Sequence, residues 1–448
     1  ARAHKRFIDL HCAANNEGAG NYLPMNLGWW AVKNWQDGTA AVWSEPTYPD
    51  DIEYLLCKAL GNGMSLSLMG VNPDNIGSMP LYQRLMPLFK RYEDLRHAGT
   101  VPESIKAKLR TPREEFVLET AEDGTPRFRP AAFHKHKVDS PDPWNAEWSV
   151  SNTFGQQPAR LRIEALPSTA PYDSPDAVLV EDFADPAAFG LRRSAEGVQA
   201  GLDRVTDLVQ AGAASGRFTA ANTRNTATGS WAQIGRTAAP PMNLADKPAL
   251  GLWVHGDGSG ALLNLQVLSA GHTGAGGTGD HYITLDFSGW RYFTLVEFES
   301  ERISDLGWPY GNAYSIYREH VDFGAVESFS LWYNNVPPGG SAACALSPVK
   351  ALPLVEVPVR NPSISINGVQ LRFPVKIPCG ASLEFQGADT CILYGKKGEE
   401  LARVTPEGGP LVLEPGDNRI VFACDANPEA PARARVTVTT TGEPLTAE

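Results

Sequence analysis

The chain has 448 residues, with 39 basic and 51 acidic side chains and a formal net charge of −12 at pH 7. Nucleic acids and anionic membrane surfaces bind basic faces, so this balance argues against either as a partner. No apolar run approaches the roughly 20 residues of a membrane span, and the first residues, ARAHKRFIDL, lack the pattern of a signal peptide. Because the chain begins with Ala rather than Met, we expect a processed product or part of a longer protein.

The N-terminal segment, residues 1–115, alternates apolar runs with helical patterns. RFIDLH is strand-like. A helix is predicted to begin at Asp50, where carboxylates cap its first turn, and to end at Gly61-Asn62-Gly63. Residues 64–71 predict a short buried strand, and residues 79–99 a second helix. This strand–helix order is typical of parallel α/β structure.

From residue 116 onward the pattern changes to short strands separated by Gly, Pro and Asp turns. A small β-sandwich is predicted over residues 116–170. A larger all-β unit with two packed sheets is predicted over 176–350. Residues 352–448 have strands about ten residues apart, which predicts an immunoglobulin-like sandwich. The expected fold class is therefore a multidomain chain with a partial α/β segment followed by all-β domains.

The six cysteines are too few for a disulfide-based scaffold. Cys12, Cys57 and Cys344 lie in apolar contexts, which predicts buried thiols. The other three fall in the C-terminal segment, where the sequence allows one pair to form a disulfide. No C-x-x-C occurs, so a zinc knuckle or redox motif is not expected.

The N-terminal segment is too short for a closed barrel. It holds at most two or three βα units, whereas an eight-fold barrel needs roughly 250 residues, and so small a parallel sheet cannot cover both of its faces. Residues 1–115 are thus either a minimal α/β layer or the last part of a barrel whose earlier strands lie elsewhere.

The order of parts resembles the C-terminal portion of multidomain bacterial glycoside hydrolases, in which a (β/α)8 barrel precedes a β-sandwich and accessory β-domains. The barrel-like runs are RFIDLHCAANN, NYLPMNLGWWAVKNW, AVWSEPTYPDDIEYLLCKALGNGMSLSLMGV and FKRYEDLRHAG. WNAEWSVSNTFGQQPARLRIEAL resembles the sandwich, and DHYITLDFSGWRYFTLVEF resembles jelly-roll modules of the galactose-binding or carbohydrate-binding kind.

The resemblance implies that residues 1–115 are the last βα units of a TIM-like barrel and that 176–350 is a carbohydrate-binding jelly roll. It also implies a carbohydrate partner, a secreted or periplasmic location, and an N-terminal segment or second chain that completes the barrel. No cofactor is expected, with a structural Ca²⁺ in the jelly-roll domain left open.

Glu45 is the candidate catalytic residue. It ends the short apolar run TAAVWSE. Glycosidases place two carboxylates around the scissile bond, and barrels present them at the C-terminal ends of strands. The resemblance to the large retaining clan implies a nucleophilic Glu after the seventh strand, which Glu45 matches if residues 64–71 form the eighth. The clan's Asn-Glu pair has no counterpart here, so a second carboxylate would come from elsewhere. A loop carboxylate paired with an arginine is the alternative.

Aromatic and polar residues near Glu45 are the candidate substrate-binding groups, because aromatic rings stack on the apolar faces of sugar rings. Trp29 and Trp30 are adjacent, so on a strand they point to opposite faces and at most one lines a site. For each candidate, core packing is the competing interpretation. The candidates are His11, Asn26, Trp29, Trp30, Trp43 and Tyr48.

Other groups carry weaker signals. His134 and His136 flank a lysine, which favours a solvated strand face over a metal site. The Gly-rich loops at 255–261 and 272–281 lack the context of a phosphate loop. The alternation of the later strands predicts a core position for most of their tryptophans, with Trp308 as the likeliest exposed ring. The tryptophans in question are Trp253, Trp290, Trp308 and Trp332.

The function expected from the resemblance is glycoside hydrolysis on a poly- or oligosaccharide by paired carboxylates. A non-catalytic carbohydrate-binding protein is the first alternative, because it requires only an aromatic platform. A polysaccharide lyase is the second, and it would depend on a basic cluster.

Overall fold

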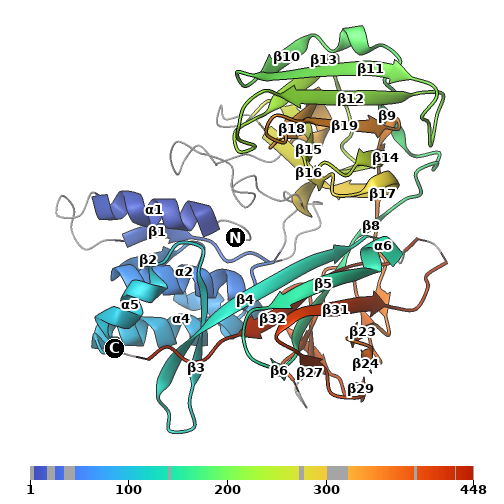
Figure 1. Cartoon of the computed structure of the whole chain (residues 1–448). Coiled ribbons are helices and arrows are strands. Elements are labelled where there is room, and N and C mark those ends of the chain that lie inside the picture. The colour runs from blue at the N-terminus through green and yellow to red at the C-terminus, as the bar shows by residue number, and fades with distance from the viewer. Residues whose placement is uncertain are drawn as a thin grey trace. The chain divides into compact units, whose positions relative to one another are not determined.

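The computed structural model describes residues 5–17, 26–34, 46–139, 143–271, 277–299, 321–387, 391–428 and 430–446. The chain forms two compact units (Figure 1). We call Ala1–Ser168 with Glu356–Glu448 the terminal unit and Thr169–Val355 the central unit. Within the described part of the chain, no helix is both long and apolar enough to span a bilayer.

The N-terminal part of the terminal unit is mainly helical. Its elements are α1 (Lys5–Glu17), β1 (Asn26–Trp30), α2 (Pro49–Asn62), β2 (Ser65–Leu68), α3 (Pro73–Ile76), α4 (Pro80–Ala98) and α5 (Glu103–Leu109). β1 and β2 pair in parallel as a two-stranded sheet. The expected barrel end is therefore not evident in the described residues. RFIDLH is also helical, within α1, rather than a strand.

Helix α2 begins and ends where its sequence predicts. Pro49 occupies its first turn, and the Asp51 carboxylate accepts the backbone N–H of Tyr48 at 3.0 Å. Gly63 ends it with φ of 68°, a left-handed conformation that glycine adopts without strain. The apolar face of α2, including Ile52, Leu56 and Leu60, packs in one buried cluster with α4 and α5.

Buried polar side chains bind α2 to its surroundings. Arg162 Nη1 donates to Asp50 Oδ1 at 2.6 Å, and Lys135 Nζ lies 2.9 Å from Asp50 Oδ2. Lys58 Nζ, on the same helix, donates to the carbonyls of Leu109 and Glu114, each at 3.0 Å. The helix is therefore held by charged groups at its start and near its end, as well as by its apolar face.

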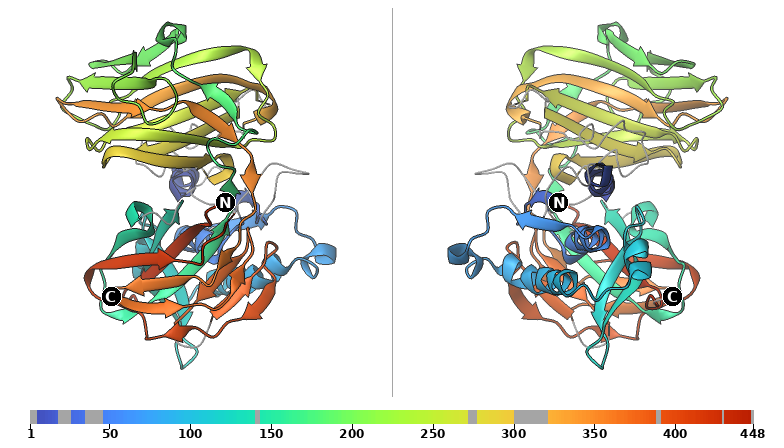
Figure 2. Two further views of the ribbon diagram at one scale, coloured as in Figure 1. Left: turned by 90° about the vertical axis from the view of Figure 1, so that its right-hand side faces the viewer. Right: turned by 90° about the vertical axis from the view of Figure 1, so that its left-hand side faces the viewer.

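A β-sandwich completes the terminal unit (Figure 2). Its seven-stranded sheet has the order β28-β27-β26-β7-β32-β4-β3, and its five-stranded sheet has the order β29-β24-β23-β31-β5. The bounds are β3 (Glu115–Thr120), β4 (Pro126–Val138), β5 (Glu147–Asn152), β7 (Arg160–Leu166), β23 (Ser363–Ile366), β24 (Val369–Arg372), β26 (Ser382–Phe385), β27 (Cys391–Tyr394), β28 (Glu400–Arg403), β29 (Glu407–Gly408), β31 (Gly416–Ala423) and β32 (Arg433–Thr441).

Both sheets draw strands from the two predicted domains 116–170 and 352–448. β32 lies between β4 and β7, and β31 pairs with β5. The structure thus places these two segments in one sandwich, with the central unit inserted between them in sequence. β32 therefore completes the seven-stranded sheet between two strands of the earlier segment.

The central unit is a second β-sandwich. Its five-stranded sheet has the order β10-β13-β18-β15-β16, and its seven-stranded sheet runs β11-β12-β19-β14-β20-β9, with β17 paired to β14. The bounds are β9 (Val178–Glu181), β10 (Leu191–Ser194), β11 (Val198–Val205), β12 (Ser215–Asn222), β13 (Ala232–Met242), β14 (Ala249–Asp257), β15 (Leu262–Ser269), β16 (Gly277–Thr284), β17 (Ser288–Val296), β18 (Val326–Asn334), β19 (Ser341–Leu346) and β20 (Val349–Leu352).

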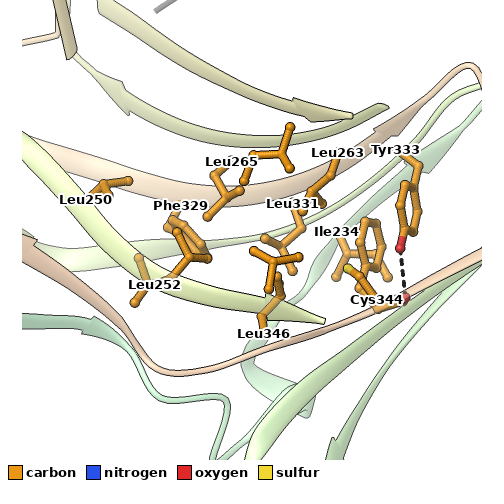
Figure 3. Packing of buried hydrophobic residues seen from close by; sticks show 14 of the residues in the cluster. Ile234, Leu250, Leu252, Leu263, Leu265, Phe329, Leu331, Tyr333, Cys344 and Leu346 are labelled. Atoms are coloured by element: carbon orange, nitrogen blue, oxygen red, sulfur yellow. Dashed lines mark hydrogen bonds between the residues drawn. The ribbon is translucent and has the colours of Figure 1, made fainter. Parts of the chain in front are cut away.

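The core of the central unit fills the space between these two sheets (Figure 3). Leu331 and Tyr333 of β18 face Leu252 and Leu346 of the opposite sheet, all fully buried. The Tyr333 ring stacks on Phe218 at 4.3 Å between centroids, and its hydroxyl donates to the Phe218 carbonyl at 3.1 Å. The expected pair of packed sheets is present.

The remaining elements are short. They are β6 (Gln157–Pro158), β8 (Ser168–Thr169), β21 (Leu354–Val355), β22 (Val359–Arg360), β25 (Lys376–Ile377), β30 (Val412–Leu413), α6 (Pro143–Ala146), η1 (Pro186–Ala188), η2 (Glu297–Glu299) and η5 (Phe323–Ala325). All six cysteines are free thiols, so the C-terminal disulfide that the sequence left open is not formed. Cys12, Cys57 and Cys344 are buried, as predicted.

Candidate functional site

The outer face of the five-stranded sheet in the central unit carries two rows of side chains that run across its strands. Strand register places directly paired residues on the same face of a sheet. The first row is Arg193, Gln233, Trp332, Asn264 and Tyr282. The second row is Leu191, Gly235, Ser330, Gln266 and Asp280. Alternate residues on the same strands, such as Ile234, Leu265 and Leu331, point into the core.

Two tryptophans lie together on this outer face. Trp332 stands on β18, at the centre of the first row, and Trp231 immediately precedes β13. Their ring centroids are 5.3 Å apart, with 41° between the ring planes. Both side chains are half-buried, so part of each indole reaches the surface. The pair forms an angled aromatic surface above the sheet.

Beside the tryptophans lies a hydrogen-bonded network of amides that ends on a carboxylate. Trp332 Nε1 donates to Gln266 Oε1 at 3.2 Å, and Gln266 Nε2 donates to Asp280 Oδ1 at 2.7 Å. Asn264 Nδ2 donates to the same Asp280 oxygen at 2.8 Å. Each side chain of the network therefore has a fixed orientation.

The centre of the face is built from small and buried polar groups. Gln233 is 4% exposed, and its Nε2 donates to Ser330 Oγ at 3.2 Å. A side chain at Gly235 would collide with Ser330, because an ideal Cβ there would lie 2.1 Å from Ser330 Oγ. Gln233 Oε1 has no hydrogen-bond partner among the residues the structure describes. An unpaired buried acceptor of this kind is costly unless something binds it.

Two of the candidates in the terminal unit meet at the carbonyl oxygen of Leu27. His11 Nε2 and Trp30 Nε1 each lie 3.1 Å from this oxygen. Phe7 stacks on the His11 ring at 5.5 Å and meets Trp30 edge-on at 6.2 Å. Asn26, on the same strand, is exposed and donates to Ser65 Oγ at 3.1 Å. These contacts give His11 and Trp30 a packing role between α1 and β1.

Tyr48 lies apart from this group, and three further candidates fall outside the described side chains. Tyr48 is 4% exposed, with the Arg162 guanidinium 3.9 Å above its ring centroid. Trp29 lies in β1, but its side chain is outside the described residues. Glu45 and Trp43 also lie outside the described residues, so their roles stay predictions.

His134 and His136 of β4 are engaged by their own neighbours. His134 Nε2 lies 3.3 Å from Thr440 Oγ1. His136 Nε2 lies 2.7 Å from the Asn145 carbonyl, and its ring stacks on Trp148 at 4.2 Å. Within the described ranges, no group of three or more His, Cys, Asp or Glu side chains is arranged to hold a metal ion.

The later tryptophans depart from their predicted core positions. Trp253, Trp290 and Trp332 are half-buried and lie outside the core cluster, and Trp308 is beyond the described residues. The sequence of β18, VESFSLWYN, contains an alternation that places Trp332 on the outer face of its sheet. Ser328 and Ser330 mark one face of the strand, and Trp332 shares that face by alternation.

No family model and no curated protein matches the chain. Similar solved structures include the family 11 carbohydrate-binding module of the cellulosomal cellulase Lic26A-Cel5E of Clostridium thermocellum, 14% identical, covering 40% of this chain and 96% of that chain, with a TM-score of 0.29. A family 30 carbohydrate-binding module has 10% identity, coverage of 41% and 90%, and a TM-score of 0.30. The CBM22-1 xylan-binding domain of Paenibacillus barcinonensis Xyn10C has 14% identity, coverage of 40% and 95%, and a TM-score of 0.24. Because these scores lie below 0.5, the likeness carries no functional conclusion for this chain.

Proposed function

We propose that the central unit binds carbohydrate on the outer face of its five-stranded sheet. The observation that carries this proposal is the Trp231–Trp332 pair beside the hydrogen-bonded amides and the Asp280 carboxylate. A sugar ring has apolar C–H faces and a rim of hydroxyl groups. Aromatic rings match the faces, and fixed amide and carboxylate groups match the rim.

The amount of ordered polar surface supports this proposal. Gln233 and Asn264 are 4% and 2% exposed, although they stand on the outer side of the sheet. Asparagine and glutamine lose rotamer freedom when they are held in one orientation. Such ordering is typical of a preformed binding surface, because the buried Asn264 amide holds Asp280, which a ligand can meet, in one orientation.

The test is binding of the whole chain to a panel of soluble polysaccharides, measured by retardation in affinity gel electrophoresis. We expect Trp332→Ala to lose at least about tenfold in affinity, since a buried aromatic anchor contributes strongly to binding. Trp253→Ala is the matched control, because Trp253 is also half-buried but stands on the other sheet. Equal retardation of the wild type and Trp332→Ala by every polysaccharide would refute the proposal.

Glycoside hydrolysis with Glu45 as nucleophile or acid/base is a separate proposal for the terminal unit. It depends on the place of Glu45 at the end of an apolar run, and it requires a second carboxylate. A sugar-release assay that compares the chain with Glu45→Gln tests it, and equal rates would remove Glu45 from catalysis. The binding proposal needs neither this activity nor a lyase activity. It accords with the expected secreted or periplasmic location, where polysaccharides are met.

A further inference from the structure

We infer that the proposed carbohydrate site selects uncharged, hydroxyl-rich glycans and rejects acidic ones, with Asp280 as the residue that determines this preference. The inference deepens the proposed function and depends on it. It follows from the direction of each hydrogen bond on the outer face of the five-stranded sheet, and from where the charges on that face lie.

The donors of the network point inward, toward one another. The indole N–H of Trp332 is used on Gln266, and an amide N–H from Gln266 and another from Asn264 are used on Asp280. Asn264 Oδ1 in turn accepts the backbone N–H of His281 at 2.9 Å. The network therefore uses the indole N–H of Trp332 and one N–H of each amide internally, and it ends on an acceptor.

Asp280 retains acceptor capacity for a ligand. An ionised carboxylate has about four lone-pair positions, and the two amide hydrogen bonds both fall on Oδ1. Asp280 is half-buried, so part of its side chain stays exposed. A surface with this acceptor suits a ligand that donates hydrogen bonds, as every sugar hydroxyl can.

An acidic sugar meets the opposite situation. A carboxylate or sulfate group donates no hydrogen bond, and its negative charge is repelled by that of Asp280. Arg193 is the other charged residue of the two rows, and it stands on β10, four strand spacings from β16. That separation is about 19 Å, well beyond the screening length of about 8 Å at physiological ionic strength. Arg193 therefore does not offset Asp280.

The discriminating variant is Asp280→Asn. Its amide oxygen can still accept from Gln266 and Asn264, so the network is kept while the charge is removed. Asp286→Asn is the matched control, because Asp286 is exposed and follows β16 outside the two rows. The probes are neutral β-glucan, xylan and galactomannan, and acidic polygalacturonate and alginate, each tested by affinity electrophoresis with the whole chain.

We expect the wild type and Asp286→Asn to bind at least one neutral glycan and neither acidic one. Asp280→Asn should bind that neutral glycan about tenfold or more weakly, since a hydrogen bond to a charged group is lost. Its ratio of acidic to neutral binding should rise.

Two results would overturn the inference and leave the proposed function standing. One is equal binding of neutral and acidic glycans by the wild type. The other is an unchanged preference in Asp280→Asn, provided that in both cases Trp332→Ala still binds about tenfold or more weakly than the wild type. If no glycan binds and Trp332→Ala behaves as the wild type, the proposed function itself fails, and the inference fails with it.

Discussion

Trp231 and Trp332 lie with their ring centroids 5.3 Å apart, although Trp231 immediately precedes β13 and Trp332 lies on β18. The pairing of β13 with β18 brings them together, since Gln233 is opposite Trp332 in that register. Their planes are inclined by 41°, so they present an angled rather than a flat surface.

The role of the Trp332 indole N–H can be separated from that of its ring. Trp332→Phe retains an aromatic ring but removes the donor that holds Gln266. We therefore expect a loss of glycan affinity smaller than that of Trp332→Ala, at about 1 kcal/mol for one neutral hydrogen bond. Titration calorimetry of the three proteins with one bound glycan measures the order. If Trp332→Phe were as weak as Trp332→Ala, the N–H rather than the ring would be the essential part.

The two rows of the outer face predict a dependence on ligand length. They cross five strands, from Leu191 and Arg193 on β10 to Asp280 and Tyr282 on β16, a span of about 19 Å. Affinity should rise with oligosaccharide length until the ligand spans the rows, and then become constant. Calorimetry with a series of defined oligosaccharides tests this. A monosaccharide that binds as well as the longest member would instead indicate a site confined to the tryptophan pair.

Local signals predicted helices α2 and α4 of the terminal unit, but neither α1, whose RFIDLH run was expected to be a strand, nor the sheets. Asp51 and Gly63 mark the ends of α2 through chemistry that is contained within a few residues. The position of β32 between β4 and β7 depends on contacts between segments separated by the whole central unit. No local pattern encodes such a pairing, so the sequence suggested two domains where there is one sandwich.

Only part of the candidate site could be predicted from the sequence. Alternation on β18 assigns Trp332 to the face of Ser328 and Ser330, and could have found it. Its neighbours Gln266 and Asp280 become part of the same site only through the register of β15 with β18 and β16. The aromatic-rich segment near Glu45 drew attention by composition, but composition does not establish which rings face outward.

The buried ion pair of Asp50 with Arg162 should be important for the stability of the terminal unit. Burial alone would raise the pKa of Asp50, but the charges of Arg162 and Lys135 outweigh it and hold that pKa well below the ordinary value. Asp50→Asn removes one of the two buried carboxylates that Arg162 contacts and leaves Glu164, 3.1 Å from its Nε, at a cost of about 3 kcal/mol. Urea unfolding at pH 7 measures this loss.

Asp94→Asn is the matched control for this ion pair. Asp94 pairs with Lys90 at 2.5 Å on the exposed side of α4, where ion pairs contribute little. Because the folded-state pKa of Asp50 is lowered, its contribution is present above the ordinary carboxyl range and is lost as pH falls below it. The difference in stability between the wild type and Asp50→Asn should therefore shrink in acid, and a difference that persists unchanged would contradict the ion-pair explanation.

Glu53 should make the terminal unit less stable as pH rises toward neutrality. Burial raises the pKa of Glu53 to about 7, against hydrogen bonds from the Leu118 N–H at 2.7 Å and the Tyr92 hydroxyl at 2.9 Å, which lower it. The folded state therefore holds a proton that the unfolded chain has released above its ordinary pKa of 4.5. The resulting stability is complete below about pH 4.5 and declines as pH rises through about 7.

Glu53→Gln tests this pH dependence, because its amide oxygen can accept both hydrogen bonds without ionising. Over this range the wild type should lose about 3 kcal/mol relative to the variant. We expect the two proteins to be similarly stable near pH 5 and the variant to be the more stable near pH 8. Urea unfolding across this range, taken as the difference between the two proteins, cancels the other titrating groups. Parallel stability curves would show that Glu53 is ionised in the folded state throughout, with Tyr92 and Leu118 sufficient to stabilise the charge.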